Sequence, residues 1–318
     1  MHTAVLFLVF NRPDTPMMAF EAIRQARPPR LYVAADGPRP GRADDWVRCE
    51  HVRRIATSVD WPCELRTLFR EGNVGCRMAV SGGIDWFFET EEEGIILEDD
   101  VVPDASFFPF CEVLLERYRA DSTVMMISGN CFHRPDHRLE FSYFFSRYTY
   151  IWGWATWRRA WEHYDRDMTR WPSLRGTDFL RRLGGVQGSH VGYWSRIFQA
   201  VHSGEIDTWD YQWLFATMAR GGLSISPSRN LAMNIGFSGD GTHTTDEAGA
   251  GARLPLEAMG FPLIHPGVVA RDPDVDQWED LHVFRLTLPL NQRARMGAKR
   301  RLTRLKSVAG KVLRWLAE

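Results

Sequence analysis

The chain has 318 residues, of which 44% are hydrophobic and 25% charged, which is the composition of an ordinary globular protein with one large domain or two modest ones. Its 39 Lys and Arg residues oppose 40 Asp and Glu residues, for a formal net charge of −1. Domains that bind nucleic acid are usually strongly basic, so this balance argues against a nucleic-acid partner.

The cysteines and the start of the chain point to a cytoplasmic protein. Five cysteines without a Cys-x-x-Cys pair predict neither a zinc site nor a disulfide framework, and a reducing compartment is the simpler home. The first ten residues lack a basic start and a cleavage site, so they predict a buried strand rather than a signal peptide. No stretch approaches the roughly 18 apolar residues of a membrane span.

The first part of the chain alternates between strand and helix patterns, and one more strand follows. Continuous apolar runs predict strands buried on both faces, and three- and four-residue spacing predicts helices. In chain order we expect a strand over Ala4–Phe10, a helix over Thr15–Gln25, a strand over Leu31–Ala35, a helix over 42–58, a strand over Glu64–Phe69, a helix over Arg77–Glu89, and strands over Gly94–Leu97 and Val124–Ile127. This alternation predicts a Rossmann-like α/β fold, with a mostly parallel sheet flanked by helices.

Past Asp100 the sequence becomes rich in aromatic residues and less regular. Eight of the 13 tryptophans lie between Trp152 and Trp213, and the segment Gly236–Arg253 has the Gly, Thr and Asp content of a loop. Most of these tryptophans fit a hydrophobic core, and some could stack on sugar rings.

The C-terminal segment 293–318 is basic and amphipathic. It holds nine Lys and Arg residues against one Glu. Apolar residues recur in it at three- and four-residue spacing, at Leu302, Leu305, Ala309, Val312 and Leu316. This pattern predicts a helix of the kind that lies in an anionic membrane surface, which would make the protein peripheral on the inner face of the cell membrane. The alternative is a helix that packs on the domain or on a partner.

Three consecutive carboxylates, Glu98, Asp99 and Asp100, directly follow the predicted strand Gly94–Leu97. Parallel sheets bind ligands at the carboxyl ends of their strands, and adjacent acids repel one another unless a cation or donors lie among them. A hard cation, Mn²⁺ or Mg²⁺, fits this position, with a diphosphate supplying further oxygens. The alternative is a solvated acidic turn. We interpret the upstream Glu91–Glu93 in that way, as a solvated helix end.

Polar residues also follow the other predicted strands. Asn11 and Arg12 end the first, and the guanidinium of Arg12 suits a diphosphate. Asp36 ends the second and could accept a hydrogen bond from the imide of a uracil-like base. Asn73 precedes the next helix and is either a plain helix start or part of an approach to a nucleoside. Asn11, Arg12 and Asp36 can also be explained as turn formers. Neither a P-loop nor a dinucleotide-binding glycine pattern occurs.

The order of these residues resembles that of the GT-A fold glycosyltransferases. More narrowly, the sequence is similar to the N-acetylglucosaminyltransferase I family and its bacterial relatives, whose metal motif is written EDD. The resemblance runs from Ala4 to His243 and rests on Asn11-Arg12, Asp36, Asn73-Val74-Gly75, the stretch GIILEDD over Gly94–Asp100, Pro103-Asp104 and Phe107-Phe108.

The resemblance implies roles for the residues that match on the donor side. Asp100 would bind the metal, Glu98 would contact the donor sugar, and Asp99 would contact the ribose side. Arg12 corresponds to the family's arginine after the first strand, and Asp36 to its base-binding aspartate. Asn11 and Asn73 would complete the donor site, and His243 lies in a stretch resembling a loop that closes over the diphosphate. That histidine is a diphosphate contact, a neighbour of the metal, or an ordinary loop residue.

On the acceptor side, Gly153 and Trp154 resemble a glycine-tryptophan element that lines the acceptor site. The stretch Trp209–Trp213 resembles the family's W-D-D-W stretch, which carries the catalytic base. The second aspartate is replaced here and the spacing is one residue longer. Because of this difference from the family's stretch, Asp210 is the candidate base and Asp207 is the alternative.

The sequence therefore predicts a metal-dependent, inverting glycosyltransferase that moves a hexosyl or N-acetylhexosaminyl group from a nucleotide-diphosphate sugar, with UDP as the expected carrier. One carboxylate would take the proton of the acceptor hydroxyl. We expect a glycan or lipid-linked glycan as acceptor, as in polysaccharide biosynthesis. Residues 1–130 would form the nucleotide-sugar half, 131–285 the acceptor half and 286–318 the tail.

Two other functions stay open at this point. A sugar-1-phosphate nucleotidyltransferase would carry a glycine-rich basic loop after the first strand, where this chain has Asn11-Arg12-Pro13. A non-enzymatic, membrane-associated glycan-binding protein would explain the tryptophans equally well, but not the acidic triplet.

Overall fold

The computed structural model describes residues 1–132, 140–184, 189–236 and 254–286. The strands are β1 (Val5–Val9), β2 (Arg30–Ala35), β3 (Glu64–Phe69), β4 (Glu93–Glu98), β5 (Val101–Pro103), β6 (Val124–Ser128), β7 (Tyr143–Ser146), β8 (Trp154–Trp157), β9 (Leu223–Pro227) and β10 (Ala232–Asn234). The helices are α1 (Pro16–Ala26), α2 (Ala43–Ala56), α3 (Cys76–Phe88), α4 (Phe107–Tyr118), α5 (Arg158–Trp161), α6 (Trp171–Leu174), α7 (Phe179–Arg182), α8 (Ser189–His202), α9 (Asp210–Arg220) and α10 (Pro273–His282). Within these residues no helix combines the length and apolar character that crossing a membrane requires.

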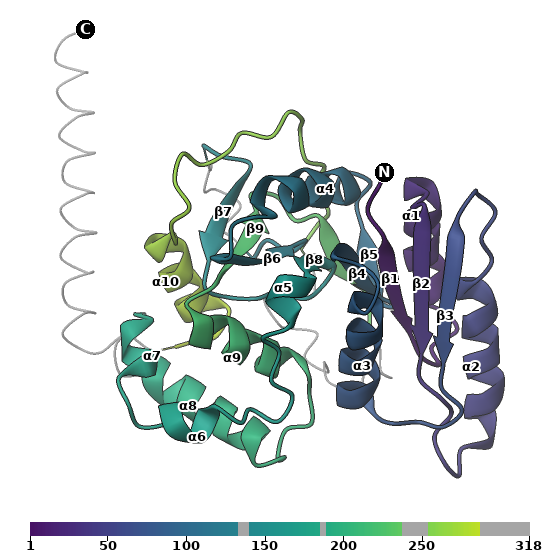
Figure 1. Cartoon of the computed structure of the whole chain (residues 1–318), viewed down its shortest axis with the longest axis horizontal. Coiled ribbons are helices and arrows are strands. Elements are labelled where there is room, and N and C mark those ends of the chain that lie inside the picture. The colour runs from purple at the N-terminus through teal and green to yellow at the C-terminus, as the bar shows by residue number, and fades with distance from the viewer. Residues whose placement is uncertain (133–139, 185–188, 237–253, 287–318) are drawn as a thin grey trace, which may run out of the picture.

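Eight strands form one sheet in the order β3-β2-β1-β4-β8-β6-β9-β7 (Figure 1). Strands β3, β2, β1 and β4 are mutually parallel. Strand β8 is antiparallel to both of its neighbours, β6 and β9 are parallel, and β7 closes the edge antiparallel to β9. The predicted α/β class with a mainly parallel sheet is confirmed.

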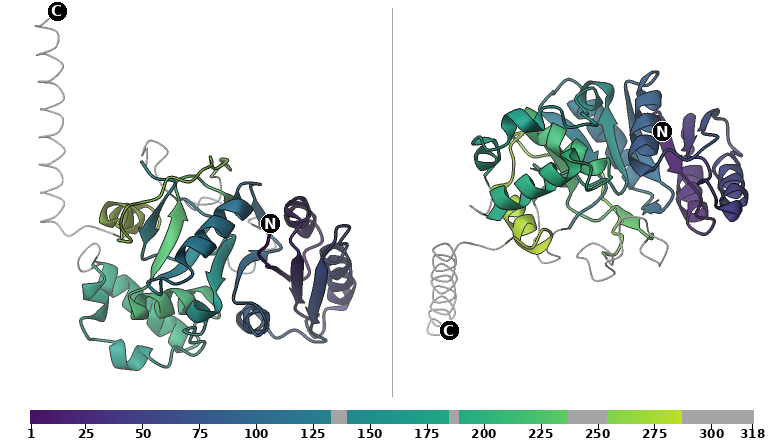
Figure 2. Two further views of the ribbon diagram at one scale, coloured as in Figure 1. Left: turned by 45° about the horizontal axis from the view of Figure 1, so that its top comes forward. Right: turned by 90° about the horizontal axis from the view of Figure 1, so that it is seen from below.

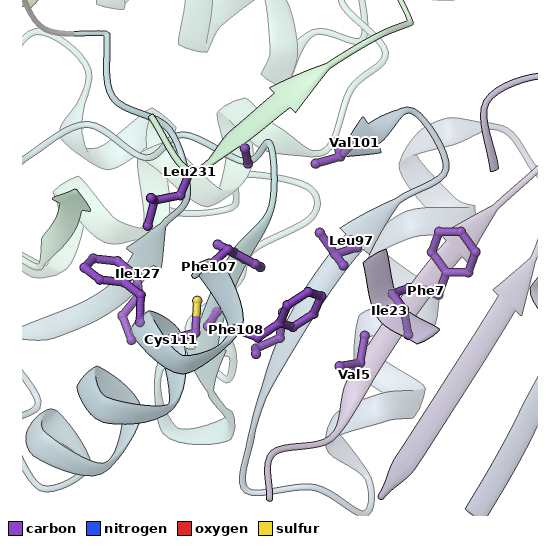
Figure 3. Packing of buried hydrophobic residues seen from close by; sticks show 14 of the residues in the cluster. Val5, Phe7, Ile23, Leu97, Val101, Phe107, Phe108, Cys111, Ile127 and Leu231 are labelled. Carbon is purple, nitrogen blue, oxygen red and sulfur yellow. The ribbon is translucent and has the colours of Figure 1, made fainter. Parts of the chain in front are cut away.

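Helices cover both faces of the sheet, and its central strands are apolar on both sides. In β1, Val5 and Phe7 face a core that includes α1, α2 and α4, whereas Leu6 and Leu8 face a core that includes α3 and α9. Figure 3 shows the first of these cores, where Phe7 and the α4 residue Phe108 lie with other buried side chains around β1 and β4. The continuous apolar runs of the sequence are therefore strands buried on both faces.

The predicted elements of the first 130 residues are all present, but the aromatic region is more regular than expected. Strand β8 lies inside it and bonds to both β4 and β6. In both views of Figure 2 the N-terminal elements lie at one side of the molecule and the segments after residue 150 at the other. One sheet runs through both sides, and the division at residue 130 stays a prediction.

The interpretation of Glu91–Glu93 as a solvated helix end is wrong. Helix α3 ends at Phe88, and Glu93 already belongs to β4. The side chain of Glu91 is buried, where it accepts hydrogen bonds from Arg30 Nε at 2.7 Å and from the Tyr32 hydroxyl at 2.9 Å. A carboxylate can be buried when a guanidinium and a hydroxyl satisfy it, and these partners lie far away in the sequence.

Candidate active site

The carboxyl ends of β1 and β4 meet at the point where the strand order reverses. Strand β1 pairs with β2 on one side and with β4 on the other, and Leu8 lies opposite Glu98. The chain segments that follow β1 and β4 therefore leave the sheet side by side. Open α/β sheets bind ligands in the crevice at such a switch point.

Two contacts join the acidic triplet to the end of β1. The backbone N–H of Phe10 donates to Asp99 Oδ2 at 2.9 Å. Arg12 Nη1 forms an ion pair with Asp100 Oδ2 at 2.5 Å, and both side chains are mostly buried. The structure thus brings Arg12 and the acidic triplet together, as the sequence predicted from strand ends alone.

The triplet carries more negative charge than its surroundings neutralise. Burial, together with the carboxylates of Asp100, Asp99 and Asp210, raises the pKa of Glu98 well above its usual range. Burial and Asp100 raise the pKa of Asp99 to about 7, against the opposing effect of the Phe10 N–H and Arg12. A bound cation would favour the ionised carboxylates.

The donor set fits a divalent cation that is shared with a ligand. In the described parts of the chain, no three His, Cys, Asp or Glu side chains converge so as to hold a metal by themselves. Mg²⁺ is commonly held by one or two carboxylates together with substrate phosphates and water, and Mn²⁺ accepts the same oxygen ligands. Asp100, next to Asp99 and Glu98, supplies carboxylates of that kind.

Gly236 covers the ion pair between Arg12 and Asp100. The backbone N–H of Ile235 donates to the carbonyl of Asp100 at 2.8 Å, so the chain after β10 runs along the triplet. A side chain at position 236 would overlap Asp100 Oδ2 and Arg12 Nη1. The absence of a Cβ therefore allows the backbone to approach this pair.

Asp36 holds the loop that leads into α3. Its carboxylate accepts hydrogen bonds from the backbone N–H groups of Gly37 at 2.8 Å and Val74 at 3.0 Å. It also accepts from Asn73 Nδ2 at 2.8 Å and from Gly75 N at 3.2 Å. Burial raises the pKa of Asp36, and these backbone donors oppose the rise. Both oxygens thus have partners within the protein, so contact with a nucleoside base stays a prediction.

Asn11 contacts α2. Its Nδ2 donates to Asp45 Oδ1 at 2.8 Å. Asp45 is buried and also accepts from Arg39 Nε at 2.6 Å. The Arg39 guanidinium holds the pKa of the Asp45 carboxyl well below its usual range. In this structure Asn11 therefore fixes the turn after β1 to α2, and its contribution to a donor site stays a prediction.

The two candidate bases lie at the start of α9, and their surroundings differ. The Thr208 hydroxyl donates a hydrogen bond to Asp210 Oδ1. The side chain of Asp207 is 62% exposed and forms an ion pair with Arg77 Nε at 3.1 Å. The carboxylate of Asp210 contributes to the raised pKa of Glu98, whereas Asp207 pairs with the first turn of α3.

The thiol of Cys76, the first residue of α3, is affected by several of these acids. Burial raises its pKa to about 12, and the carboxylates of Glu98, Asp210, Asp207 and Asp100 act in the same direction. Carboxylates more than 130 positions away from Cys76 in the sequence thus act on this thiol, together with those that follow β4.

The predicted acceptor contacts lie deeper in the molecule. Gly153 has φ +66°, a conformation that favours glycine. The side chain of Trp154 is fully buried and packs against Trp209, Trp213 and Trp161, with ring centroids between 5.8 and 6.2 Å apart. No part of this indole reaches the surface, and acceptor contact by this pair stays a prediction. His243 lies outside the described residues.

Three residues at the site were missed by the sequence analysis. Arg77 pairs with a candidate base, Gly236 covers the ion pair, and Thr208 bonds to Asp210. None follows a predicted strand or belongs to a short pattern. Of the three, only Thr208 could have been recognised from the local sequence, because Ser and Thr side chains often bond to groups near the start of a helix.

Comparison with known proteins finds no matching family model and no matching curated sequence. The solved structures that are remotely similar include three enzymes. A mannosyltransferase from Pyrobaculum calidifontis in complex with GDP-Man and Mn²⁺ is 15% identical over 76% of this chain, with a TM-score of 0.43. A cytidylyltransferase from Leptospira borgpetersenii is 12% identical over 57% of this chain and 71% of its own, with a TM-score of 0.32. A UDP-glucose pyrophosphorylase is 9% identical over 71% of this chain and 90% of its own, with a TM-score of 0.35.

The chain spans 59% of the length of the mannosyltransferase structure. These three neighbours are nucleotide-sugar enzymes, and none of them is described as an N-acetylglucosaminyltransferase. At such identities and TM-scores they say nothing of what this chain binds.

Proposed function

We propose that this protein is a metal-dependent glycosyltransferase that moves a sugar from a nucleotide-diphosphate donor to a glycan or lipid-linked glycan acceptor. One observation carries the proposal. An arginine and three carboxylates meet at the switch point of the sheet, and the carboxylate of Asp210 on α9 contributes to the raised pKa of Glu98. A diphosphate needs a cationic group, a metal needs carboxylate ligands, and the acceptor hydroxyl needs a carboxylate that takes its proton.

On the donor side, Arg12 binds the diphosphate, since a guanidinium matches phosphate oxygens in geometry and charge. Asp100 holds the metal, Mn²⁺ or Mg²⁺, while Glu98 faces the donor sugar and Asp99 the ribose. When bound, the cation neutralises the charge that develops on the leaving diphosphate. Asp36 keeps the loop at Asn73 in place beside the nucleoside.

On the acceptor side, Asp210 takes the proton of the attacking hydroxyl. A single base that approaches the donor from another element suits an inverting transfer. The hydrogen bond from Thr208 fixes the orientation of the Asp210 carboxylate. Asp207 is the weaker candidate because it is exposed and already paired with Arg77.

The identity of the donor base is left to measurement, with UDP as our first choice. The protein's own donors satisfy the Asp36 carboxylate, which weakens the argument for uracil from this residue. Calorimetry with UDP, GDP and dTDP, each with and without Mn²⁺, tests the proposal. We expect one of them to bind only with metal, and Asp100→Ala to lose that binding.

Glu92→Gln is the matched control. Glu92 is a highly exposed carboxylate directly before β4, the strand that leads to Asp100. The variant should bind like the wild type. If none of the three nucleotides binds with any metal, the proposed function is wrong and a glycan-binding protein becomes the leading alternative. Pyrophosphate release from a nucleoside triphosphate would instead indicate a nucleotidyltransferase.

A further inference from the structure

The ion pair between Arg12 and Asp100 joins two groups that the proposed function assigns to different ligands. Arg12 is the group for the diphosphate and Asp100 the group for the metal. Here Nη1 of the first lies 2.5 Å from Oδ2 of the second. Only 23% of the Arg12 side chain and 15% of the Asp100 side chain are exposed, so water screens this pair weakly.

A guanidinium and a divalent cation compete for the negative charge of one carboxylate. The two positive charges would also repel each other across a mostly buried site, where Coulomb forces are stronger than in water. The affinity of Asp100 for a metal is therefore lower while Arg12 is paired with it.

A diphosphate offers Arg12 a second anionic partner. Bidentate pairs between Arg and phosphate are among the strongest charge-assisted hydrogen bonds in proteins. A side chain that moves from a carboxylate to a phosphate keeps its charge paired throughout. The exchange thus avoids the cost of leaving a mostly buried guanidinium without an anion.

We propose that Arg12 makes metal binding conditional on the nucleotide. Without a donor, Arg12 occupies Asp100 and keeps metal affinity low. With a donor, it moves to the diphosphate and releases Asp100 for the metal. This inference rests on the proposed function. It adds an order of binding, in which the donor binds to Arg12 before the metal binds tightly to Asp100.

The exchange predicts a coupling between two binding events that can be measured without turnover. The nucleotide should raise the affinity for Mn²⁺, and Mn²⁺ should raise the affinity for the nucleotide by the same factor. Such couplings are typically about 5- to 150-fold. Because Arg12 carries the coupling, its removal should raise the affinity for Mn²⁺ alone and lower the affinity for the nucleotide.

The test is a titration of the whole chain with Mn²⁺ alone, with free Mn²⁺ read by electron paramagnetic resonance. It is repeated with a saturating amount of the nucleoside diphosphate that the wild type binds best. We expect Arg12→Ala to bind Mn²⁺ alone about fivefold or more tightly than the wild type does, and to show little further gain with nucleotide. Arg12→Lys keeps the charge and should keep the low affinity.

Arg48→Ala is the charge-matched control, because Arg48 pairs with Asp44 on the exposed side of α2. It removes one positive charge from the same half of the molecule and should leave Mn²⁺ affinity unchanged. Thermal melting shows whether each variant is folded. If Arg12→Ala melts below the titration temperature, Arg12→Met, which keeps the apolar stem, takes its place.

The possible failures can be told apart. If the wild type binds metal and nucleotide together but the Arg12 variants bind Mn²⁺ alone no more tightly, the exchange is wrong and the proposed function stands. If the wild type binds no nucleoside diphosphate, the proposed function is wrong. The competition between Arg12 and metal is then judged on the titration with Mn²⁺ alone.

Discussion

The side-chain amide of Asn73 donates a hydrogen bond of 2.8 Å to Asp36 Oδ2, which joins the loop before α3 to the end of β2. The same carboxylate accepts from the backbone of Val74 and Gly75. Asp36 is therefore a structural centre of this edge of the sheet, whatever else it contacts.

We expect Asp36→Ala to lower the free energy of unfolding by about 2 kcal/mol, because the donors around this buried carboxylate lose their acceptor. Nucleotide binding should weaken as well, because the loop at Asn73 is no longer held. Urea denaturation and calorimetry measure the two effects. Asp44→Ala, which removes an exposed acid on α2, should change stability by less than about 0.5 kcal/mol. A variant that loses nucleotide binding with no loss of stability would show instead that Asp36 reads the base directly.

The two candidate bases give a paired test of the acceptor side. We expect Asp210→Asn to lower kcat by about 10²–10⁴-fold with nucleotide affinity retained, because the amide cannot take a proton. Asp207→Asn should leave kcat within a few-fold of the wild type, since that carboxylate is exposed and paired with Arg77. The reverse order of effects would assign the base to Asp207.

The strands and the donor edge of the site could be predicted from local patterns. Continuous apolar runs mark β1, β2 and β4, and polar residues at their ends must meet if the strands are parallel neighbours. That reasoning placed Arg12 at the same crevice as the acidic triplet, and the ion pair between Arg12 and Asp100 shows that they are close.

What could not be predicted depends on partners far away in the sequence. Glu91 can be buried because Arg30 and Tyr32 on β2 satisfy its carboxylate. Strand β8 has its place because it bonds antiparallel to both β4 and β6, which lie far from it in the sequence. The close approach of Gly236 to the triplet depends on the pairing of β10 with β5. Such long-range pairings cannot be predicted from the spacing of apolar residues along the sequence.

A buried polar cluster on α10 predicts a pH dependence of stability. Asp276 accepts a hydrogen bond from the Ser146 hydroxyl at 2.7 Å, and burial raises its pKa to about 6 despite the nearby Arg147. The unfolded value is about 3.9. Because the folded state favours the protonated form, this group stabilises the fold below pH 4, and the contribution is lost as the pH rises to about 6.

The variant Asp276→Asn removes this titrating group and leaves the neighbouring acids Glu279 and Asp280 in place. Relative to the variant, the wild type should lose about 2–3 kcal/mol of unfolding free energy between pH 4 and 6. Urea denaturation at several pH values measures the difference. A difference that stays constant over this range would contradict the raised pKa of Asp276.

The basic segment 293–318 lies outside the described residues, and its role as a membrane anchor stays a prediction. Each Lys or Arg near an anionic surface contributes about 1 kcal/mol of attraction. We expect deletion of this segment to abolish sedimentation with anionic vesicles and to leave nucleotide binding unchanged. Zwitterionic vesicles are the control. If the truncated protein binds anionic vesicles as the full chain does, the segment packs on the domain or on a partner instead.

The central claim is that the acidic triplet and Arg12 bind a nucleotide-sugar donor for transfer. The most direct measurement is nucleoside diphosphate release from a panel of UDP-, GDP- and dTDP-sugars with Mn²⁺, for the wild type and for Asp100→Asn. We predict release from at least one donor by the wild type, faster when glycan acceptors are added, and none by the variant. No release from any donor, or equal release by the variant, would contradict the assignment of this site.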